Sequence, residues 1–182
     1  MALNGNTKNK IYQIKGENQK MNYLNILDCS VIDGEGVRVA LFVSGCSHHC
    51  PGCHNPESWD PQAGKQFTKE TENELIQLLS RSFIKGITLT GGDPLFCDNR
   101  KVLTKFCKTL KEQLPEKNIW CYTGFLWEAV KDLEIMNYID VLVDGPFIES
   151  EKDLQLAFRG SKNQRIIDVQ KSKIAEKIIL RK

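Results

Sequence analysis

Three cysteines are the residues of this chain whose type and spacing point most directly to chemistry. Cys46, Cys50 and Cys53 follow a Cys-x3-Cys-x2-Cys spacing. Pro51 fixes one backbone angle between the last two cysteines, and Gly52 leaves the next position permissive, so the segment can curl around a single centre. Because thiolates select zinc, copper(I) or iron–sulfur clusters over hard cations, this spacing predicts a soft-metal site.

Three interpretations of this cluster stay open at the level of the residues. Free cysteines are often simply buried, although burial does not require this spacing. A zinc ion could take a Cys3His tetrahedron, since all three histidines of the chain lie in the same loop: His48, His49 and His54. A four-iron four-sulfur cluster could be held by three cysteines with one iron left open. None of the other cysteines is spaced as an obvious fourth ligand: Cys29, Cys97, Cys107 and Cys121.

Two further segments carry polar residues directly after apolar runs. Gly91-Gly92-Asp93-Pro94 follows the run 87–90, and Asp144-Gly145-Pro146 follows the run 139–143. Taken alone, both are good turn sequences, because Gly and Asp-Pro favour tight turns. Their position next to the cysteine loop is what makes Gly91, Gly92, Asp93 and Asp144 candidates for a site.

The elements that must position these residues alternate along the chain. Short apolar runs predict strands over 37–43, 87–90, 119–122 and 139–143, with a last apolar pair at 166–167. Helical spacing predicts helices over about 69–82, around 102–110 and over 126–136. Thr71 to Glu74 resembles a capping box at the start of the first helix.

Strand and helix in alternation are typical of right-handed βαβ units and a parallel sheet, so we expect one α/β domain. Chemistry in such folds sits at the carboxyl ends of the strands. The cysteine loop follows the first predicted strand, and Gly91-Gly92-Asp93 follows the second. Both therefore fall at the end of the sheet where a site is expected.

Composition narrows the class of protein. The chain has 182 residues, a formal charge of only +2 and a longest apolar run of five residues, Val39–Val43, which argues against bulk-charge nucleic-acid binding and against a membrane span. Seven cysteines, an odd number, fit a disulfide framework badly. We expect a cytoplasmic protein with a polar, disordered extension or leader over residues 1–20 and a single domain over 21–182.

The cysteine motif and its flanks resemble a known superfamily. Cys-x3-Cys-x2-Cys after a first strand is similar to the cluster motif of the radical S-adenosylmethionine enzymes. The flanks 33–38, 41–45 and 51–55 resemble the glycyl-radical-enzyme activases, in particular the branch whose protein substrate is an anaerobic ribonucleoside-triphosphate reductase. The resemblance covers residues 21 to about 169. One departure is Glu35, where many members have proline.

The resemblance implies a fold, two cofactors and two partners. The fold would be a partial (β/α) barrel, mostly parallel, with flanking helices. Cys46, Cys50 and Cys53 would ligate one 4Fe-4S cluster, and S-adenosylmethionine would cap the fourth iron. The protein would take an electron from a low-potential donor such as flavodoxin and generate a glycyl radical on the reductase.

The resemblance also implies positions that meet S-adenosylmethionine. The glycine-rich element Gly91-Gly92, with Asp93, would approach its amino group. Backbone groups around Gly52, Cys53 and His54 would meet the adenine, and Asp144 would meet ribose or a substrate peptide. Arg159 and Arg165 are more simply surface or interface charges than ligands for the cofactor carboxylate.

Two other functions remain as alternatives. One is activation of a different glycyl radical enzyme such as pyruvate formate-lyase, or other radical S-adenosylmethionine chemistry. The other is a zinc-binding module without catalysis. In every case Cys107, on the apolar face of a helix, and Cys121, within a strand, are expected to be core residues.

Overall fold

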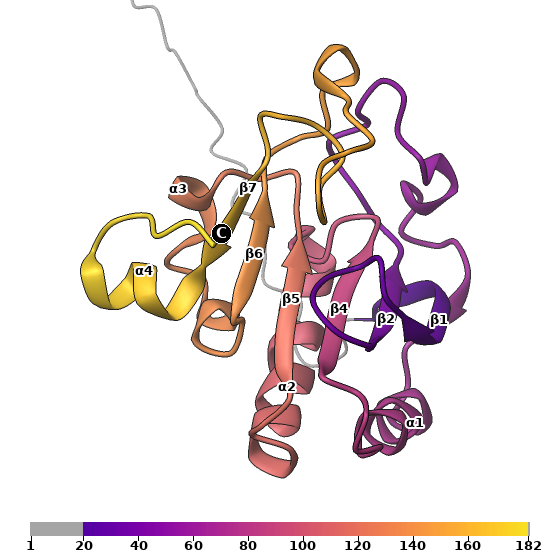
Figure 1. Ribbon diagram of the computed structural model, residues 1–182. Coiled ribbons are helices and arrows are strands. Elements are labelled where there is room, and N and C mark those ends of the chain that lie inside the picture. The colour runs from indigo at the N-terminus through magenta and orange to yellow at the C-terminus, as the bar shows by residue number, and fades with distance from the viewer. Residues whose placement is uncertain (1–19, 182) are drawn as a thin grey trace, which may run out of the picture.

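A mixed β-sheet runs through the described part of the chain, residues 20–181 of a computed structural model (Figure 1). Within these residues the strand order is β3-β1-β2-β4-β5-β6-β7, so β3 and β7 are edges and the sheet is not closed. The extension expected over residues 1–20 lies, apart from Lys20, outside the described residues. The strands are β1 (Asn22–Ser30), β2 (Arg38–Val43), β3 (Lys65–Gln66), β4 (Gly86–Gly91), β5 (Asn118–Tyr122), β6 (Val141–Asp144) and β7 (Arg165–Asp168).

The centre of the sheet is parallel and its flanks are antiparallel. Strands β2, β4, β5 and β6 pair in parallel, in register from Arg38 opposite Gly86 onward. β1 and β3 on one flank and β7 on the other pair antiparallel to their neighbours. The prediction of an α/β domain with a mostly parallel sheet is therefore confirmed for the four central strands, and the flanks make the whole sheet mixed.

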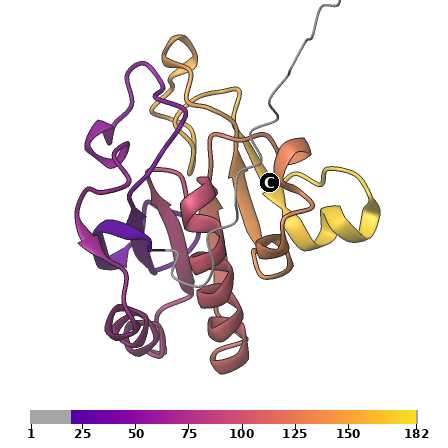
Figure 2. The same ribbon diagram turned by 180° about the vertical axis from the view of Figure 1, so that it is seen from behind.

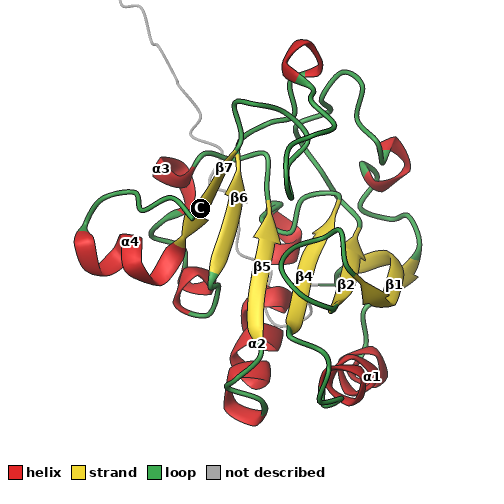
Figure 3. Ribbon diagram, viewed as in Figure 1, coloured by secondary structure: helices red, strands yellow, loops and turns green. Residues whose placement is uncertain are grey.

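The helices lie mainly on one face and beyond one edge of the sheet. They are α1 (Lys69–Leu79), α2 (Cys97–Gln113), α3 (Trp127–Val130) and α4 (Val169–Ala175), with 3-10 turns η1 (Pro56–Ser58), η2 (Glu134–Asn137) and η3 (Glu149–Glu151). Figure 2 shows α2 lying across the sheet on the face turned to the viewer, and α4 beyond the β7 edge. Figure 3 shows long loops gathered beyond the ends to which β4, β5 and β6 point.

The N-cap of helix α1 lies three residues before the start of the capping box suggested by the sequence. Its N-cap is Thr68, whose side chain accepts from the backbone N–H of Thr71, while the Thr71 side chain accepts from the backbone N–H of Thr68. The expectation that Thr71 itself opens the box is wrong. Thr71 is already in the first turn, where its hydroxyl serves as the partner that Glu or Gln supplies in the usual motif.

The helix predicted over 126–136 is broken. After the four-residue α3 the chain turns extended at Leu133 (φ −68°, ψ 140°) and resumes as η2. An unbroken helix of about 3.6 residues per turn would point Trp127 and Met136 in opposite directions. Both are buried, at 6% and 0% exposure, so the break lets both side chains reach the core.

Strand β1 has no counterpart among the predicted elements. Much of it is exposed or half-buried, and bulges interrupt its pairing with β2. Its apolar residues therefore lack the regular alternation by which an amphipathic strand is recognised. β1 nonetheless places β2 away from the edge, so that the strand leading into the cysteine loop is buried along most of its length.

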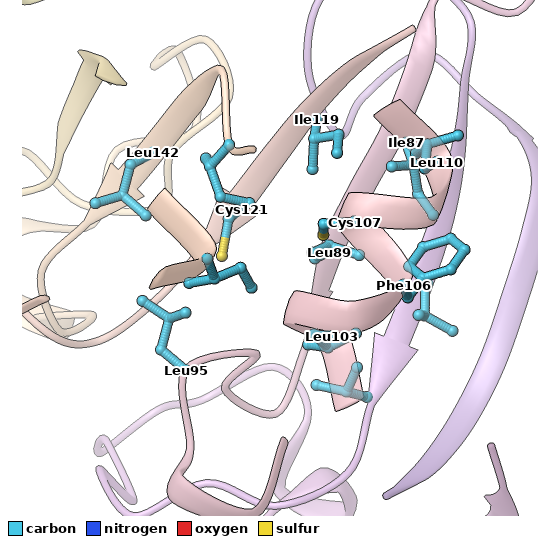
Figure 4. Packing of buried hydrophobic residues seen from close by; sticks show 14 of the residues in the cluster. Ile87, Leu89, Leu95, Leu103, Phe106, Cys107, Leu110, Ile119, Cys121 and Leu142 are labelled. Atoms are coloured by element: carbon cyan, nitrogen blue, oxygen red, sulfur yellow. The ribbon is translucent and has the colours of Figure 1, made fainter. Parts of the chain in front are cut away.

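The main core lies between α2 and the central strands. Leu103, Phe106, Cys107 and Leu110 of α2 point toward Ile87 and Leu89 of β4 and Ile119 and Cys121 of β5 (Figure 4). Cys107 and Cys121 are fully buried, as predicted. Burial raises the pKa of the Cys107 thiol to about 12, so this thiol stays protonated at neutral pH.

The opposite face of the sheet buries an arginine. The Arg38 guanidinium donates to Thr88 Oγ1 (2.8 Å) and to the Ile87 carbonyl (2.6 Å), and lies 5.4 Å from the centre of the Trp120 ring. Burial lowers the pKa of Arg38 to about 10. The carbonyl of Glu35 also accepts from Arg38, and the Glu35 carboxylate accepts from Arg181 Nε (2.9 Å), so this loop is tied to the end of the described chain.

None of the helices in residues 20–181 is both long and apolar enough to cross a membrane.

The packing of α2 predicts which of two phenylalanines matters for stability. Phe106→Ala should lower the free energy of unfolding by about 3–5 kcal/mol, because it opens a cavity beneath α2. Phe83→Ala is the control: Phe83 is 54% exposed beside Arg81, and its loss should cost about 1 kcal/mol or less. Urea unfolding measures both, and equal losses would contradict this description of the core.

Candidate functional site

The three predicted cysteines line one cavity beyond the carboxyl end of β2. Cys46, Cys50 and Cys53 are all half-buried and face a cavity of about 220 Å³. The same cavity is lined by the ends of β4 and β5 and by the segment after β6, and its further lining includes Gly91, Thr123, Phe147 and Gln164. The site therefore draws on every loop that follows a central parallel strand.

Backbone hydrogen bonds hold the start of the cysteine loop in place. The N–H of Gly45 donates to the carbonyl of Ser58 (2.8 Å), and the N–H of Cys46 donates to the carbonyl of Trp59 (3.2 Å). A turn follows in which the N–H of Cys53 donates to the carbonyl of Cys50 (3.1 Å). The loop thus closes on itself around the three thiols.

Close approach of other backbone segments requires glycine at the last residue of β4 and at the residue after it. Gly91 has φ +99°, and a Cβ there would lie 2.6 Å from the backbone nitrogen of Val43. A Cβ on Gly92 would lie 2.7 Å from the Gly45 carbonyl oxygen and 2.9 Å from that of Ser58. Both glycines also line the cavity, so a bound group can approach their backbone as closely as the loop does.

Asp93 joins the cysteine loop to the loop after β5. It is 1% exposed, and its carboxylate accepts from the hydroxyl of Thr123 (2.9 and 3.0 Å), the N–H of Gly124 (3.1 Å) and the N–H of Leu95 (2.8 Å). His48 Nε2 lies 2.9 Å from Oδ2, close enough for an ion pair, although the ring N–H is not aligned for a hydrogen bond. The carboxylate is therefore occupied by protein groups.

His48 packs between these two loops. Its ring meets Phe125 edge-on, with centroids 4.5 Å apart, and lies directly over Gly124, where a Cβ would come within 2.4 Å of the ring. Any side chain at position 124 would displace the imidazole. Gly124 and Asp93 together fix where this segment of the cysteine loop sits.

Two buried polar atoms at the cavity lack a hydrogen-bond partner among the described residues. They are Nε2 of His48 and Nε1 of Trp59, and both residues line the cavity. Native structures satisfy most such atoms, and an unsatisfied one costs about 1–3 kcal/mol. The cavity is thus built around polar groups as well as thiols.

The donor set suits a thiolate-bound metal centre larger than one ion. Burial raises the pKa of the Cys46 thiol, against hydrogen bonds from the backbone N–H groups of His48 and His49, which lower it. Within the part of the chain that the structure describes, no three His, Cys, Asp or Glu side chains gather closely enough to hold a single metal ion. Thiols are the ligands that soft metals and iron–sulfur clusters take.

Not every predicted site residue faces the cavity. Cys53, His54, Gly91, Gly92 and Asp93 line it, whereas Gly52 and Asp144 do not. Gly52 (φ +71°) makes the turn between two cysteines, and a Cβ there would collide with the side chain of Glu149.

Asp144 is fully buried beneath the cavity. Its oxygens accept from the N–H of Trp127 (2.7 Å) and from Arg165 Nε (3.0 Å), and Arg165 also pairs with Glu128. In this structure its carboxylate caps α3 and binds an arginine, and the contact with ribose or a substrate peptide stays a prediction. Arg165 is thus a paired charge in this structure, and Arg159 donates to the carbonyl of Gln164 (2.7 Å).

Sequence reasoning missed several residues at the cavity. Trp59, Thr123 and Gly124 are among them, and so is Tyr122, whose hydroxyl donates to the carbonyl of Phe158 (2.8 Å). Thr123-Gly124 directly follows the strand predicted over 119–122, so its position after a parallel strand was the available signal. Trp59 carried no such signal, because its place depends on the backbone pairing with Cys46.

Comparison with known proteins agrees with this site. A family model described as "4Fe-4S single cluster domain" matches residues 32–167, which include the three cysteines of the loop. The fold and site thus define an α/β protein of the single-cluster iron–sulfur class.

Curated relatives identify the family to which the chain belongs within this iron–sulfur class. Anaerobic ribonucleoside-triphosphate reductase-activating proteins are 44% identical in Enterobacteria phage T4 over 146 residues (80% of this chain, 93% of the relative) and 43% identical in Pasteurella multocida over 152 residues (80% and 96%). That of Escherichia coli K12 is 40% identical over 148 residues (79% and 96%). The chain belongs to the family of anaerobic ribonucleoside-triphosphate reductase-activating proteins.

The hydrogen bonds of Asp93 predict a test that needs no bound cofactor. Asp93→Asn keeps the shape of the side chain but turns one acceptor oxygen into an N–H donor facing other donors, so the apoprotein should lose about 1–3 kcal/mol of unfolding free energy. Urea unfolding measures the loss, and iron content after reconstitution should fall with it. Asp132→Asn, at an exposed site, is the control. An unchanged D93N apoprotein would contradict the joining role of this carboxylate.

Proposed function

We propose that this protein activates an anaerobic ribonucleoside-triphosphate reductase by generating a glycyl radical on it, through reductive cleavage of S-adenosylmethionine at a 4Fe-4S cluster. The observation that carries the proposal is the single cavity shared by Cys46, Cys50, Cys53 and the Gly91-Gly92 backbone. The names of the relatives supply the reductase as the target.

Cys46, Cys50 and Cys53 would each hold one iron, and the fourth iron would stay open toward the cavity. When bound, the cluster supplies one low-potential electron that breaks a sulfur–carbon bond of S-adenosylmethionine, giving methionine and a 5′-deoxyadenosyl radical that takes a hydrogen atom from the target glycine. The reduction potential of such clusters is set by hydrogen bonding and exposure. In this chain, the partial burial of the three thiols and the desolvation of Cys46 would help to set this reduction potential.

The remaining residues would orient the cofactor. The backbone of Gly91 and Gly92 would leave room for the ammonium group of its methionine moiety, and His54 with the Cys53 backbone, which line the same cavity, would meet the adenine. Asp93, by contrast, would act as a positioning residue, because its carboxylate already accepts from Thr123, Gly124 and Leu95. No general base is required, since the substrate loses a hydrogen atom rather than a proton.

We further propose that the open sheet is the partial-barrel form of the radical S-adenosylmethionine fold. Because the sheet does not close, the segment 145–164 between β6 and β7 can form one wall of the cavity, through Gly145, Phe147, Gly160 and Gln164. A protein substrate needs such access, because the reacting glycine is part of a folded chain. Free thiols and an electron at low potential suit the reducing cytoplasm, where we place the protein.

The alternatives are less well supported. A zinc module would need a tetrahedral ligand set, and the described side chains do not provide three ligands around one point. Activation of another glycyl radical enzyme shares the same chemistry but finds no support in the names of the relatives, which specify the ribonucleotide reductase.

The electron for the cleavage would come from a low-potential donor protein such as flavodoxin.

Cysteine variants test this function. Protein purified and reconstituted without oxygen should be brown and should release 5′-deoxyadenosine from S-adenosylmethionine when dithionite is added, as measured by chromatography. Cys46→Ala should reduce the release to the level without protein, since one iron loses its ligand. Cys29→Ala, which removes an exposed thiol outside the cavity, should leave it unchanged. Colourless, zinc-containing protein, or release that survives Cys46→Ala, would contradict the proposal.

A further inference from the structure

The outward side of α2 carries a row of exposed lysines. Lys101, Lys105 and Lys108 stand at i, i+4 and i+7, so they lie along one side of the helix, between Asp98 and Glu112 and opposite the side that packs on the sheet. Among residues 20–181, none of the three has an ion-pair partner within 4.0 Å. We call these three residues the lysine row.

The surface around the lysine row is hollowed and predominantly cationic. One hollow of about 420 Å³ adds Arg100 and Glu134 to the row, and another of about 310 Å³ adds Lys69 and Glu72. Glu72 is already neutralised by Lys69, with Nζ and Oε1 2.7 Å apart. Since the whole chain has a formal charge of only +2, this surface is a local concentration of positive charge and not a reflection of the overall composition.

Ring contacts connect the lysine row to the cysteine loop. The guanidinium of Arg100, in the first hollow, lies 5.4 Å from the centre of the Phe125 ring, and Phe125 meets the His48 ring at 4.5 Å. His48 stands two residues after Cys46 and lines the cysteine cavity. The first hollow is therefore connected to the loop that carries the thiols through Arg100, Phe125 and His48.

The row is nevertheless separate from the cavity. Among the described residues, neither hollow shares a lining residue with the cysteine cavity. Helix α2 lies across one face of the sheet (Figure 2), whereas the cavity is lined by the loops that follow the central parallel strands. A protein substrate has to reach the cavity itself, so a partner on the row can bind while the cavity stays open.

We propose that the lysine row is the docking surface for an acidic, electron-carrying protein. This inference rests on the proposed function, which requires one electron from outside for each S-adenosylmethionine cleaved. The carrier is oxidised by one electron, the bound cluster is reduced by one electron, and no bond forms or breaks in docking. Complementary charge steers such encounters and is strongest at low salt.

Charge reversal on the full-length, cluster-loaded protein tests the proposal. The probe is a purified acidic flavodoxin, and the readout is its association rate and Kd at low and at high salt. The triple variant K101E/K105E/K108E should associate at least about tenfold more slowly at low salt, and the difference should shrink as salt screens the charges. The milder variant K101Q/K105Q/K108Q should associate at a rate between that of the parent protein and that of K101E/K105E/K108E.

A matched control reverses three exposed lysines elsewhere. K65E/K131E/K177E makes the same change of net charge at positions on β3, after α3 and after α4, and should bind flavodoxin as the parent does to within about twofold. Equal weakening by both triple variants would show a general charge effect and overturn the docking site. Unchanged binding by K101E/K105E/K108E would also overturn it.

Two further readouts separate this inference from the proposed function. With dithionite, which needs no docking, K101E/K105E/K108E should release 5′-deoxyadenosine at the parent rate. If the parent itself releases none, the proposed function fails, while the flavodoxin binding data still judge the row. If the variant keeps flavodoxin but loses the reductase in a binding assay, the row serves the substrate protein and the proposal is overturned.

Discussion

The buried carboxylate of Asp93 is the interaction on which the geometry of this site depends. A carboxylate that is 1% exposed needs hydrogen bonds to offset its lost hydration, and this one finds them on separate segments of the chain. Leu95 donates from its own turn, and Thr123 and Gly124 donate from the loop after β5, with His48 of the cysteine loop 2.9 Å away. The loops after three parallel strands are thereby held at one point, and the thiols are placed relative to the glycines.

The same crowding explains the backbone of the site. The cysteine loop approaches the end of β4 so closely that the carbonyl of Gly45 both accepts from the N–H of Asp93 (2.8 Å) and excludes any side chain at position 92. The packing of the backbone requires glycine at these positions, and the space left by the missing side chains is available to a bound group. A turn motif and a cofactor-binding motif are therefore not competing descriptions of Gly91-Gly92, because the close approach of backbone is what both require.

The sequence predicts the parts of the fold that depend on local pattern. Buried central strands are short apolar runs, so β2, β4 and β5 are found within a residue or so, and the cysteine spacing marks its loop. What depends on tertiary packing was missed: β1 is a partly exposed flank strand, and the break after α3 exists because Trp127 and Met136 must reach the same core. At the site, the position of Asp144 at the end of a strand predicts a ligand, and its burial with Arg165 could not be predicted from that position. Hydrogen bonds between residues 30 positions apart, such as Thr123 to Asp93, leave no trace in a local pattern.

The function proposed for the cavity around Cys46, Cys50 and Cys53 is to produce a radical that removes a hydrogen atom from a glycine of the reductase. The most direct measurement uses reductase labelled with deuterium on its glycine α-carbons, incubated without oxygen with the reduced protein and S-adenosylmethionine. We predict a glycyl radical in the paramagnetic resonance spectrum of the reductase and one deuterium in the 5′-deoxyadenosine recovered. A glycyl radical without deuterium transfer, or 5′-deoxyadenosine formed with no radical on the reductase, would contradict the account.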